Sequence, residues 1–318
     1  MTAVPEPGAQ AAPDREAAAP RRGARRRGNR LGFLCFESAA RLCGLRGAYG
    51  LLYIVCAWYL LCDRPAVRAG LAYIRRRFPA ASRLGRLALV YRLFVSQGRI
   101  LIDRHCLVAG RGAFELELRG HDRIAGLLQD PSRGFVLLTA HVGNWQVVLE
   151  AVRRFQRPVG LLMRPEDNPA AQASLAVGRE SAVVRIISPD SFLGGVVELM
   201  GLLRQGYVVS LMGDRSYGFN AVEVPFLGQP ARLPYGAFHI AAAAECPVVV
   251  LFSAKVATRR YIVEAAEVLH PCYARGLPKR DQARAWAGQF ARALEAYTAR
   301  FPLQCFLFRD VWRENAGE

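Results

Sequence analysis

The sequence has little that favours a metal site, a disulfide framework or nucleic-acid binding. Its five histidines form no HxxxH or HExxH cluster, so we expect no metal. Its eight cysteines form no CxxC pair and have no regular spacing, so we expect them to be reduced and mostly buried. The net charge of +17 comes without a helix-turn-helix, zinc-finger or aromatic-basic pattern. An anionic membrane surface is therefore the expected partner of this charge, and nucleic acid is not.

The first segment, residues 1–30, is also poor in large apolar side chains. It consists mostly of Ala, Pro, Gly and Arg, and it cannot bury enough surface to offset the entropy lost on ordering. We predict a disordered basic tail, whose arginines either rest on anionic lipid head groups or are simply solvated. No convincing cleavage site follows the next apolar region, so a signal peptide is not expected.

One uncharged apolar stretch follows, from Gly47 to Cys62. Its sixteen residues are fewer than the roughly 20 that a full membrane span needs. It carries Tyr49, Tyr53 and Trp58, which suit a membrane interface. A short span, a helix that enters one leaflet and a buried core helix all remain open. We assign residues 31–66 to a membrane-associated helical segment and residues 67–318 to one α/β domain.

The remaining chain has the pattern of an α/β fold with a mostly parallel central sheet flanked by helices. Residues 66–78 and 86–104 are predicted to be helical, with Gly85 at the break between them. A short strand is expected at 114–119 and a short helix at 121–128. Apolar strands and helices then alternate, with strands expected at 134–140, 159–163, 183–187, 207–212, 247–254 and 261–268, and helices at 144–155, 169–182, 191–205, 235–245 and 279–300.

Polar side chains follow several of these strands. His141 comes after the first strand of the alternating region, Arg164 after the second, and Asp214 with Arg215 after the fourth. Carboxyl ends of parallel strands lie at one edge of a sheet, so we expect these loops to surround one binding site, with Arg179 near it. Such a cluster suits a general base and an anionic substrate. Alternatively, the histidine caps a helix and the arginines make surface ion pairs.

Several motifs occur in the order found in one known family. They are the apolar segment followed by Leu71–Arg76, the stretch His141–Trp145, Arg164-Pro165 with Asn168-Pro169, Gly213-Asp214-Arg215, Val224–Ala231, and Phe301–Gln304 with Phe308-Arg309. Over about residues 45–313 the chain resembles the lysophospholipid acyltransferase superfamily, in the branch of the lipid A biosynthesis (lauroyl and myristoyl) acyltransferases. The resemblance implies transfer of a fatty acyl group from acyl carrier protein or coenzyme A to a lipid hydroxyl.

The family signature is a histidine followed five positions later by Asp or Glu, and this sequence has Gln146 there. A glutamine can orient the imidazole but cannot supply a negative charge. Three alternatives remain: Gln146 suffices, Glu150 or Asp214 supplies the charge, or the site binds lipid without catalysis. The expected catalytic residues are His141, Gln146 and Asp214, and the expected substrate-binding residues are Asn144, Arg164, Arg179, Arg215 and Gly228.

The resemblance also implies partners and a location. We expect no resident cofactor, because acyl-ACP or acyl-CoA is a co-substrate. The expected acceptor is a membrane lipid or glycolipid such as a lipid A precursor, with a lysophospholipid or an ornithine-type lipid as alternatives. We expect a monomer at the cytoplasmic face of the bacterial inner membrane.

Overall fold

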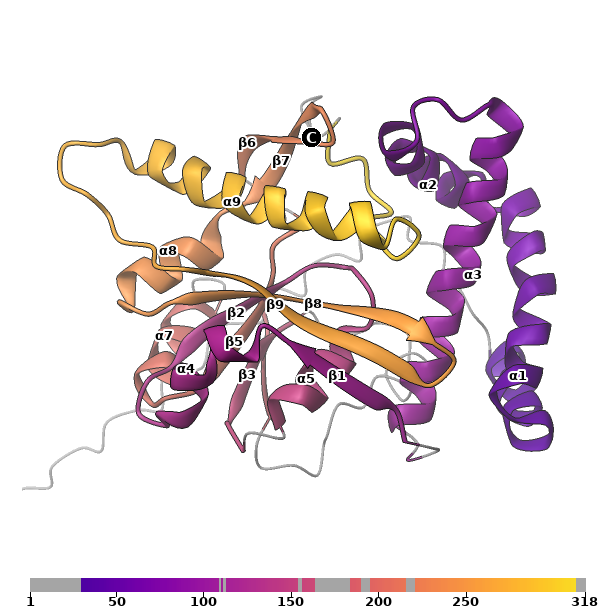
Figure 1. Cartoon of the computed structure of the whole chain (residues 1–318), viewed down its shortest axis with the longest axis horizontal. Coiled ribbons are helices and arrows are strands. Elements are labelled where there is room, and N and C mark those ends of the chain that lie inside the picture. The colour runs from indigo at the N-terminus through magenta and orange to yellow at the C-terminus, as the bar shows by residue number, and fades with distance from the viewer. Residues whose placement is uncertain are drawn as a thin grey trace, which may run out of the picture.

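The computed structural model describes residues 30–108, 110, 113–153, 156–163, 184–189, 195–215 and 221–312 (Figure 1). The predicted basic tail up to residue 29 and the predicted helix at 169–182 lie outside these residues. The helices are α1 (Arg30–Cys62), α2 (Arg64–Arg77), α3 (Arg83–Val108), the 3-10 turn η1 (His121–Arg123), α4 (Ala125–Gln129), α5 (Trp145–Arg153), α7 (Val196–Arg204), α8 (Gly236–Ala243) and α9 (Lys279–Arg300). The strands are β1 (Glu115–Arg119), β2 (Phe135–Thr139), β3 (Val159–Leu162), β4 (Val184–Ile187), β5 (Val208–Met212), β6 (Ala221–Phe226), β7 (Gln229–Pro234), β8 (Val248–Ala257) and β9 (Arg260–Leu269).

Seven strands form the central sheet, in the order β1-β9-β8-β2-β5-β3-β4. Every neighbouring pair is parallel except β8 and β9, which form an antiparallel hairpin. The predicted α/β fold with a mostly parallel sheet is therefore confirmed. The fully buried strand β2 reads FVLLT, which is the continuous apolar run expected of a strand covered on both faces.

Successive residues of a strand point to opposite faces of the sheet, so the apolar strands present apolar side chains on both faces. Helices cover each of these faces. Val136 and Leu138 of β2 pack into one core with α7, α8 and α9, whereas Phe135 and Leu137 pack into a second core with α5. Figure 1 shows α9 on one side of the β8–β9 hairpin and α5 on the other. The two cores fix the sheet between them.

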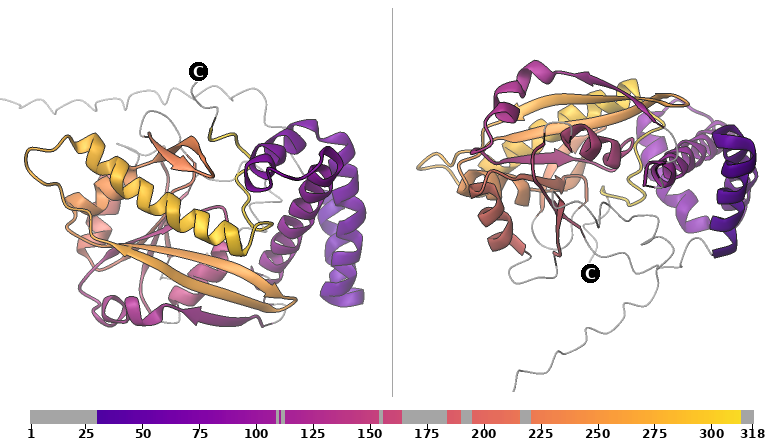
Figure 2. Two further views of the ribbon diagram at one scale, coloured as in Figure 1. Left: turned by 45° about the horizontal axis from the view of Figure 1, so that its top comes forward. Right: turned by 90° about the horizontal axis from the view of Figure 1, so that it is seen from below.

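The N-terminal helices α1, α2 and α3 pack on one another at one end of the sheet (Figures 1 and 2). The apolar stretch predicted from residue 47 belongs to a longer helix, α1, with a kink at Gly44, whose φ is 65°. Its part from Leu34 to Cys62 is long and apolar enough to cross a membrane by length and composition. Only 28% of the most apolar window is buried, which disfavours the interpretation as a core helix.

The predicted break at Gly85 is wrong. Gly85 lies in the first turn of α3, and the chain leaves the helical conformation between residues 78 and 82. Ser82 explains the difference, because its Oγ accepts a hydrogen bond from the Gly85 N–H at 3.1 Å and so caps the new helix.

A buried charged cluster joins these helices to the sheet. The carboxylate of Asp103 on α3 is fully buried and accepts hydrogen bonds from the Tyr49 hydroxyl of α1, the Lys255 ammonium of β8 and the Tyr261 hydroxyl of β9. Both oxygens of the buried carboxylate thus have protein donors, as a buried charge requires. The helical bundle is therefore attached to the α/β domain by a specific polar contact as well as by packing.

The prediction that most cysteines are buried is wrong. All eight are free, but only Cys56, Cys106 and Cys305 are buried, whereas Cys35, Cys43, Cys62 and Cys272 are exposed. Three of the exposed cysteines lie on α1, whose outer face is not covered by the described chain.

Candidate active site

Strand pairing brings two of the predicted catalytic residues together. β2 and β5 are adjacent and parallel, and Thr139 is paired with Met212 at their carboxyl ends. His141 and Asp214 each lie two residues beyond this pair, although 73 positions separate them in sequence. The Gly213 N–H donates to the Thr139 carbonyl at 2.8 Å and keeps the two chains together past the last pair.

His141 and Asp214 form a hydrogen-bonded dyad. Nδ1 of His141 lies 3.0 Å from both Oδ1 and Oδ2 of Asp214. An ionised carboxylate can only accept hydrogen bonds, so Nδ1 carries the proton and Nε2 is free to act as a base. Asp214 has 0% of its side chain exposed and His141 has 27%. Within the described chain Nε2 makes no hydrogen bond, so the dyad has a buried acid and an accessible base.

The surroundings keep Asp214 ionised. Burial raises the pKa of this carboxyl, but the adjacent His141 and the charge of Arg215 lower it by more, so the pKa lies below its ordinary value. A buried carboxylate that stays charged is able to stabilise an imidazolium on the neighbouring ring.

The turn after His141 is held by close backbone packing. Gly143 has a φ of 52°, and a Cβ there would lie 1.8 Å from the Ser253 carbonyl oxygen, so only glycine fits. The Asn144 N–H donates to Ser253 Oγ at 2.8 Å, and this hydroxyl donates back to the Asn144 carbonyl at 2.9 Å. Asn144 Oδ1 accepts from the Gln146 N–H at 3.2 Å, which caps α5. Asn144, predicted to bind substrate, is therefore placed as the cap of α5.

The C-terminal segment (residues 301–312) packs against the turn that follows His141. The Phe306 N–H donates to the His141 carbonyl at 2.7 Å, and the Gly143 N–H donates to the Gln304 carbonyl at 3.0 Å. Arg215 donates from Nη2 to the Phe306 carbonyl at 2.8 Å. Arg215, another predicted substrate-binding residue, thus holds this segment against the His141 loop.

Gln146 and Glu150 are placed differently from Asp214. The Gln146 side chain is buried, and neither its Oε1 nor its Nε2 has a hydrogen-bond partner among the described residues. It therefore makes no hydrogen bond to His141. Glu150 is exposed on α5. Of the three residues proposed to orient the imidazole, Asp214 is the one that is hydrogen-bonded to it in the described structure.

The other predicted residues lie farther out or outside the described chain. Gly228, with a φ of 74°, is at the turn between β6 and β7 and lines a groove beside α2. Arg164 and Arg179 lie outside the described residues. Within the part of the chain that the structure describes, no group of three or more His, Cys, Asp or Glu side chains could hold a metal ion.

Sequence reasoning did not identify Ser253 as part of this site. The only sequence signal is a hydroxyl within the apolar run of the strand predicted at 247–254. Its contact with Asn144 depends on the position of β8 beside β2, which no local pattern encodes.

Distant similarities to known proteins include a solved structure and a curated protein. The chain is 12% identical to the 1-acyl-sn-glycerophosphate (LPA) acyltransferase PlsC of Thermotoga maritima, with a TM-score of 0.38 over 80% of this chain and 98% of that one. It is also 26% identical over 139 residues to a chloroplastic 3-phosphoshikimate 1-carboxyvinyltransferase of Solanum lycopersicum. That match covers 42% of this chain and only 27% of the relative's length. Neither similarity is large enough to support a functional assignment.

A family model gives the assignment instead. The model described as bacterial lipid A biosynthesis acyltransferase matches residues 76–313. The matched region is about three quarters of the 318 residues and contains both members of the dyad. The chain therefore belongs to the bacterial lipid A biosynthesis acyltransferase family and is an acyltransferase that acts on lipids.

Proposed function

We propose that this protein transfers a fatty acyl group from an acyl thioester to a hydroxyl of a lipid or glycolipid acceptor, with His141 as the general base and Asp214 as its partner. The observation that carries this proposal is the contact of His141 Nδ1 with both oxygens of a fully buried carboxylate, at 3.0 Å. A base of this kind can activate a hydroxyl without a covalent enzyme intermediate.

The proposed reaction proceeds through one tetrahedral intermediate. Nε2 of His141 takes the proton of the acceptor hydroxyl while its oxygen attacks the thioester carbonyl carbon. The imidazolium that forms is stabilised by the Asp214 carboxylate. When the intermediate collapses, the carbon–sulfur bond breaks and the imidazolium returns the proton to the leaving thiolate. The products are the acylated lipid and a free thiol.

In this proposal Asp214 replaces the acid that the family signature places five residues after the histidine. Gln146 occupies that position but makes no hydrogen bond to the imidazole, whereas Asp214 supplies both the hydrogen bond and the charge. The proposal therefore gives Gln146 no direct part in proton transfer. It favours an active enzyme over a lipid-binding protein that has lost catalysis.

We further propose that the reaction takes place at a membrane, at the cytoplasmic face of the bacterial inner membrane. The apolar helix α1 and the net charge of +17 support association with an anionic membrane surface. On its outer side α1 exposes large apolar side chains, including Ile54, Trp58 and Leu61. Acyl carrier protein and coenzyme A are both possible donors, and a lipid A precursor is the proposed acceptor class.

The test uses purified full-length protein in detergent with palmitoyl-ACP or palmitoyl-CoA and extracted bacterial lipids as acceptors. Release of free thiol and the appearance of an acylated lipid by mass spectrometry are measured together. We expect His141→Ala to abolish both, because the proposed mechanism relies on this imidazole as its base. Transfer at the wild-type rate by that variant would refute the assignment of the base. If the sole acylated product comes from a lysophospholipid or an ornithine-type lipid, that lipid is the acceptor and the lipid A precursor is not.

A further inference from the structure

A groove of about 930 Å³ lies between α2, the β6–β7 turn and the C-terminal segment. Its lining contains four arginines and one carboxylate, which are Arg68, Arg75, Arg76, Arg309 and Asp310. Like charges repel one another, so arginines gathered in one groove favour the binding of an anion.

Two of these arginines are available to a ligand. Arg68 and Arg75 are exposed, and neither makes a hydrogen bond or an ion pair with the described residues. They are seven residues apart on α2, close to two helical turns, so they share one face and lie roughly 10 Å apart along the axis. Arg76, in contrast, is held in place, because its Nε donates to Gln229 at 2.8 Å and its guanidinium stacks on Trp312 at 4.1 Å.

The groove also has an apolar lining. Leu71 lies between the two free arginines on α2, Leu227 comes from the β6–β7 turn, and Phe308 from the C-terminal segment. A ligand with a charged group and an adjoining hydrocarbon would contact both kinds of surface. This combination suits an anionic lipid better than a soluble anion or the broad surface of an acidic protein.

The groove lies where the apolar helix ends. α1 ends at Cys62, and α2 begins at Arg64, capped by Asp63, whose Oδ1 accepts from the Ala66 N–H at 3.0 Å. The exposed Trp58 and Leu61 belong to the last turns of α1. If α1 is in the membrane, α2 lies at the depth of the lipid phosphates, because aromatic side chains mark that interface.

A short segment connects the groove to the dyad. Phe306 binds the His141 carbonyl through its N–H, and Phe308, two residues later, lines the groove. Two residues span at most about 7 Å, so this segment runs from the backbone of His141 to the edge of the groove.

We propose that this groove binds the phosphate-bearing head group of the lipid acceptor, with Arg68 and Arg75 as its ligands, and so presents the acceptor hydroxyl to His141. This inference rests on the proposed function, since it assigns the acceptor end of the same site. Arginine suits this role because its guanidinium can donate two parallel hydrogen bonds to one phosphate.

The test measures binding without turnover, by isothermal titration of the full-length protein in a neutral detergent. The probe is dihexanoyl phosphatidic acid, and dihexanoyl phosphatidylcholine and inorganic phosphate are the comparison ligands. The wild-type protein should bind the phosphatidic acid most tightly. In the double variant R68Q/R75Q this affinity should fall about tenfold or more, since a lost charge-assisted hydrogen bond is worth about that factor. R68K/R75K, which keeps the charge but not the paired donors, should lie between them.

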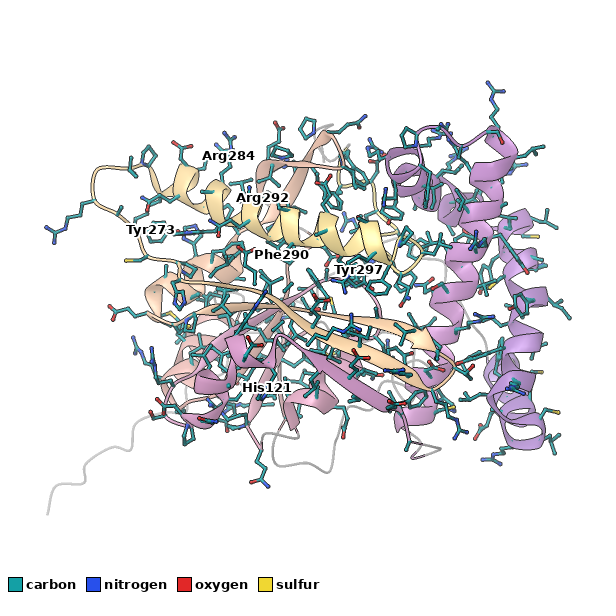
Figure 3. The ribbon with its side chains drawn as sticks, viewed as in Figure 1. His121, Tyr273, Arg284, Phe290, Arg292 and Tyr297 are labelled. Carbon is teal, nitrogen blue, oxygen red and sulfur yellow. The ribbon has the colours of Figure 1, made fainter. Side chains whose placement is uncertain are left out.

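The matched control is R284Q/R292Q, which removes the same charge from two exposed arginines of α9 (Figure 3). Neither residue lines the groove, so this variant should bind as the wild type does. An equal loss in this control, no loss in R68Q/R75Q, or inorganic phosphate binding as tightly as the lipid would each overturn the proposal. Loss of acyl-ACP binding in R68Q/R75Q with lipid binding intact would assign the groove to the carrier protein and also overturn it.

His141→Ala separates this proposal from the proposed function. It should bind the short-chain phosphatidic acid normally while transferring no acyl group. Normal transfer by His141→Ala, with binding lost only in R68Q/R75Q, would refute the base and leave the groove assignment standing.

Discussion

Replacing Asp214 with asparagine tests which residue supplies the charge of the dyad. Asparagine keeps the size of the side chain but removes its charge. Its amide can also donate to Nδ1, which would place the imidazole proton on Nε2 and leave no base facing the acceptor. Because Asp214 is fully buried, we do not expect it to contact the substrate. The structure therefore predicts a fall in kcat with little change in KM.

The expected magnitude follows from the geometry. Both carboxylate oxygens lie 3.0 Å from Nδ1, so the variant loses orientation of the ring and stabilisation of the imidazolium together. The same replacement in a serine protease triad lowers kcat by about 10⁴. We expect a reduction of roughly 10² to 10⁴ here, since the acyl thioester is a more reactive substrate than an amide.

The assay is steady-state thiol release with Gln146→Leu as the companion variant. Gln146 has two buried polar atoms without a partner in the described chain, so leucine should be tolerated and kcat should stay within about threefold. The reverse result, an active Asp214→Asn and an inactive Gln146→Leu, would refute the assignment of Asp214.

Three further predictions concern stability. Gly143→Ala should lower the free energy of unfolding by at least about 3 kcal/mol, because its Cβ would lie 1.8 Å from the Ser253 carbonyl oxygen, and a normal melting temperature would contradict this. Asp103→Ala should cost about 3–5 kcal/mol in chemical denaturation, because it leaves the Lys255 ammonium largely buried without its partner, whereas a loss below 1 kcal/mol would contradict this. The lowered pKa of Asp214 means that its carboxylate contributes stability above its ordinary pKa of about 3.9, and this contribution is lost as the pH falls through the lower folded value. Asp214→Asn should therefore lose less stability than the wild type when the pH falls below about 4, as measured by the melting temperature at each pH. An equal loss in both proteins would argue against the lowered pKa of Asp214.

The sequence was sufficient to predict the elements of the sheet. The strand predicted at 159–163 is β3, and the helix predicted at 279–300 coincides with α9. Continuous apolar strands and long amphipathic helices carry their own periodicity, so they can be recognised locally. The β6–β7 hairpin was not predicted as strands, because Pro225 and Pro230 break the usual strand composition.

The candidate site was only partly predictable. His141 and Asp214 were both identified as candidates because each follows an apolar strand. Their contact could not be derived, since strand order and register depend on pairing across the whole sheet. The groove beside α2 was also beyond reach, because it joins α2 to the β6–β7 turn about 150 positions later in the chain.

The pairing of β2 with β5 has a consequence for how activity is lost. In the family signature the acid and the base lie on one short segment, which could keep its shape when the rest of the protein loosens. In the proposed dyad the acid and the base follow different strands, and the pairing of β2 with β5 brings them together. Heat inactivation should therefore coincide with melting of the sheet. The segments that connect the two strands can differ in length without moving the dyad.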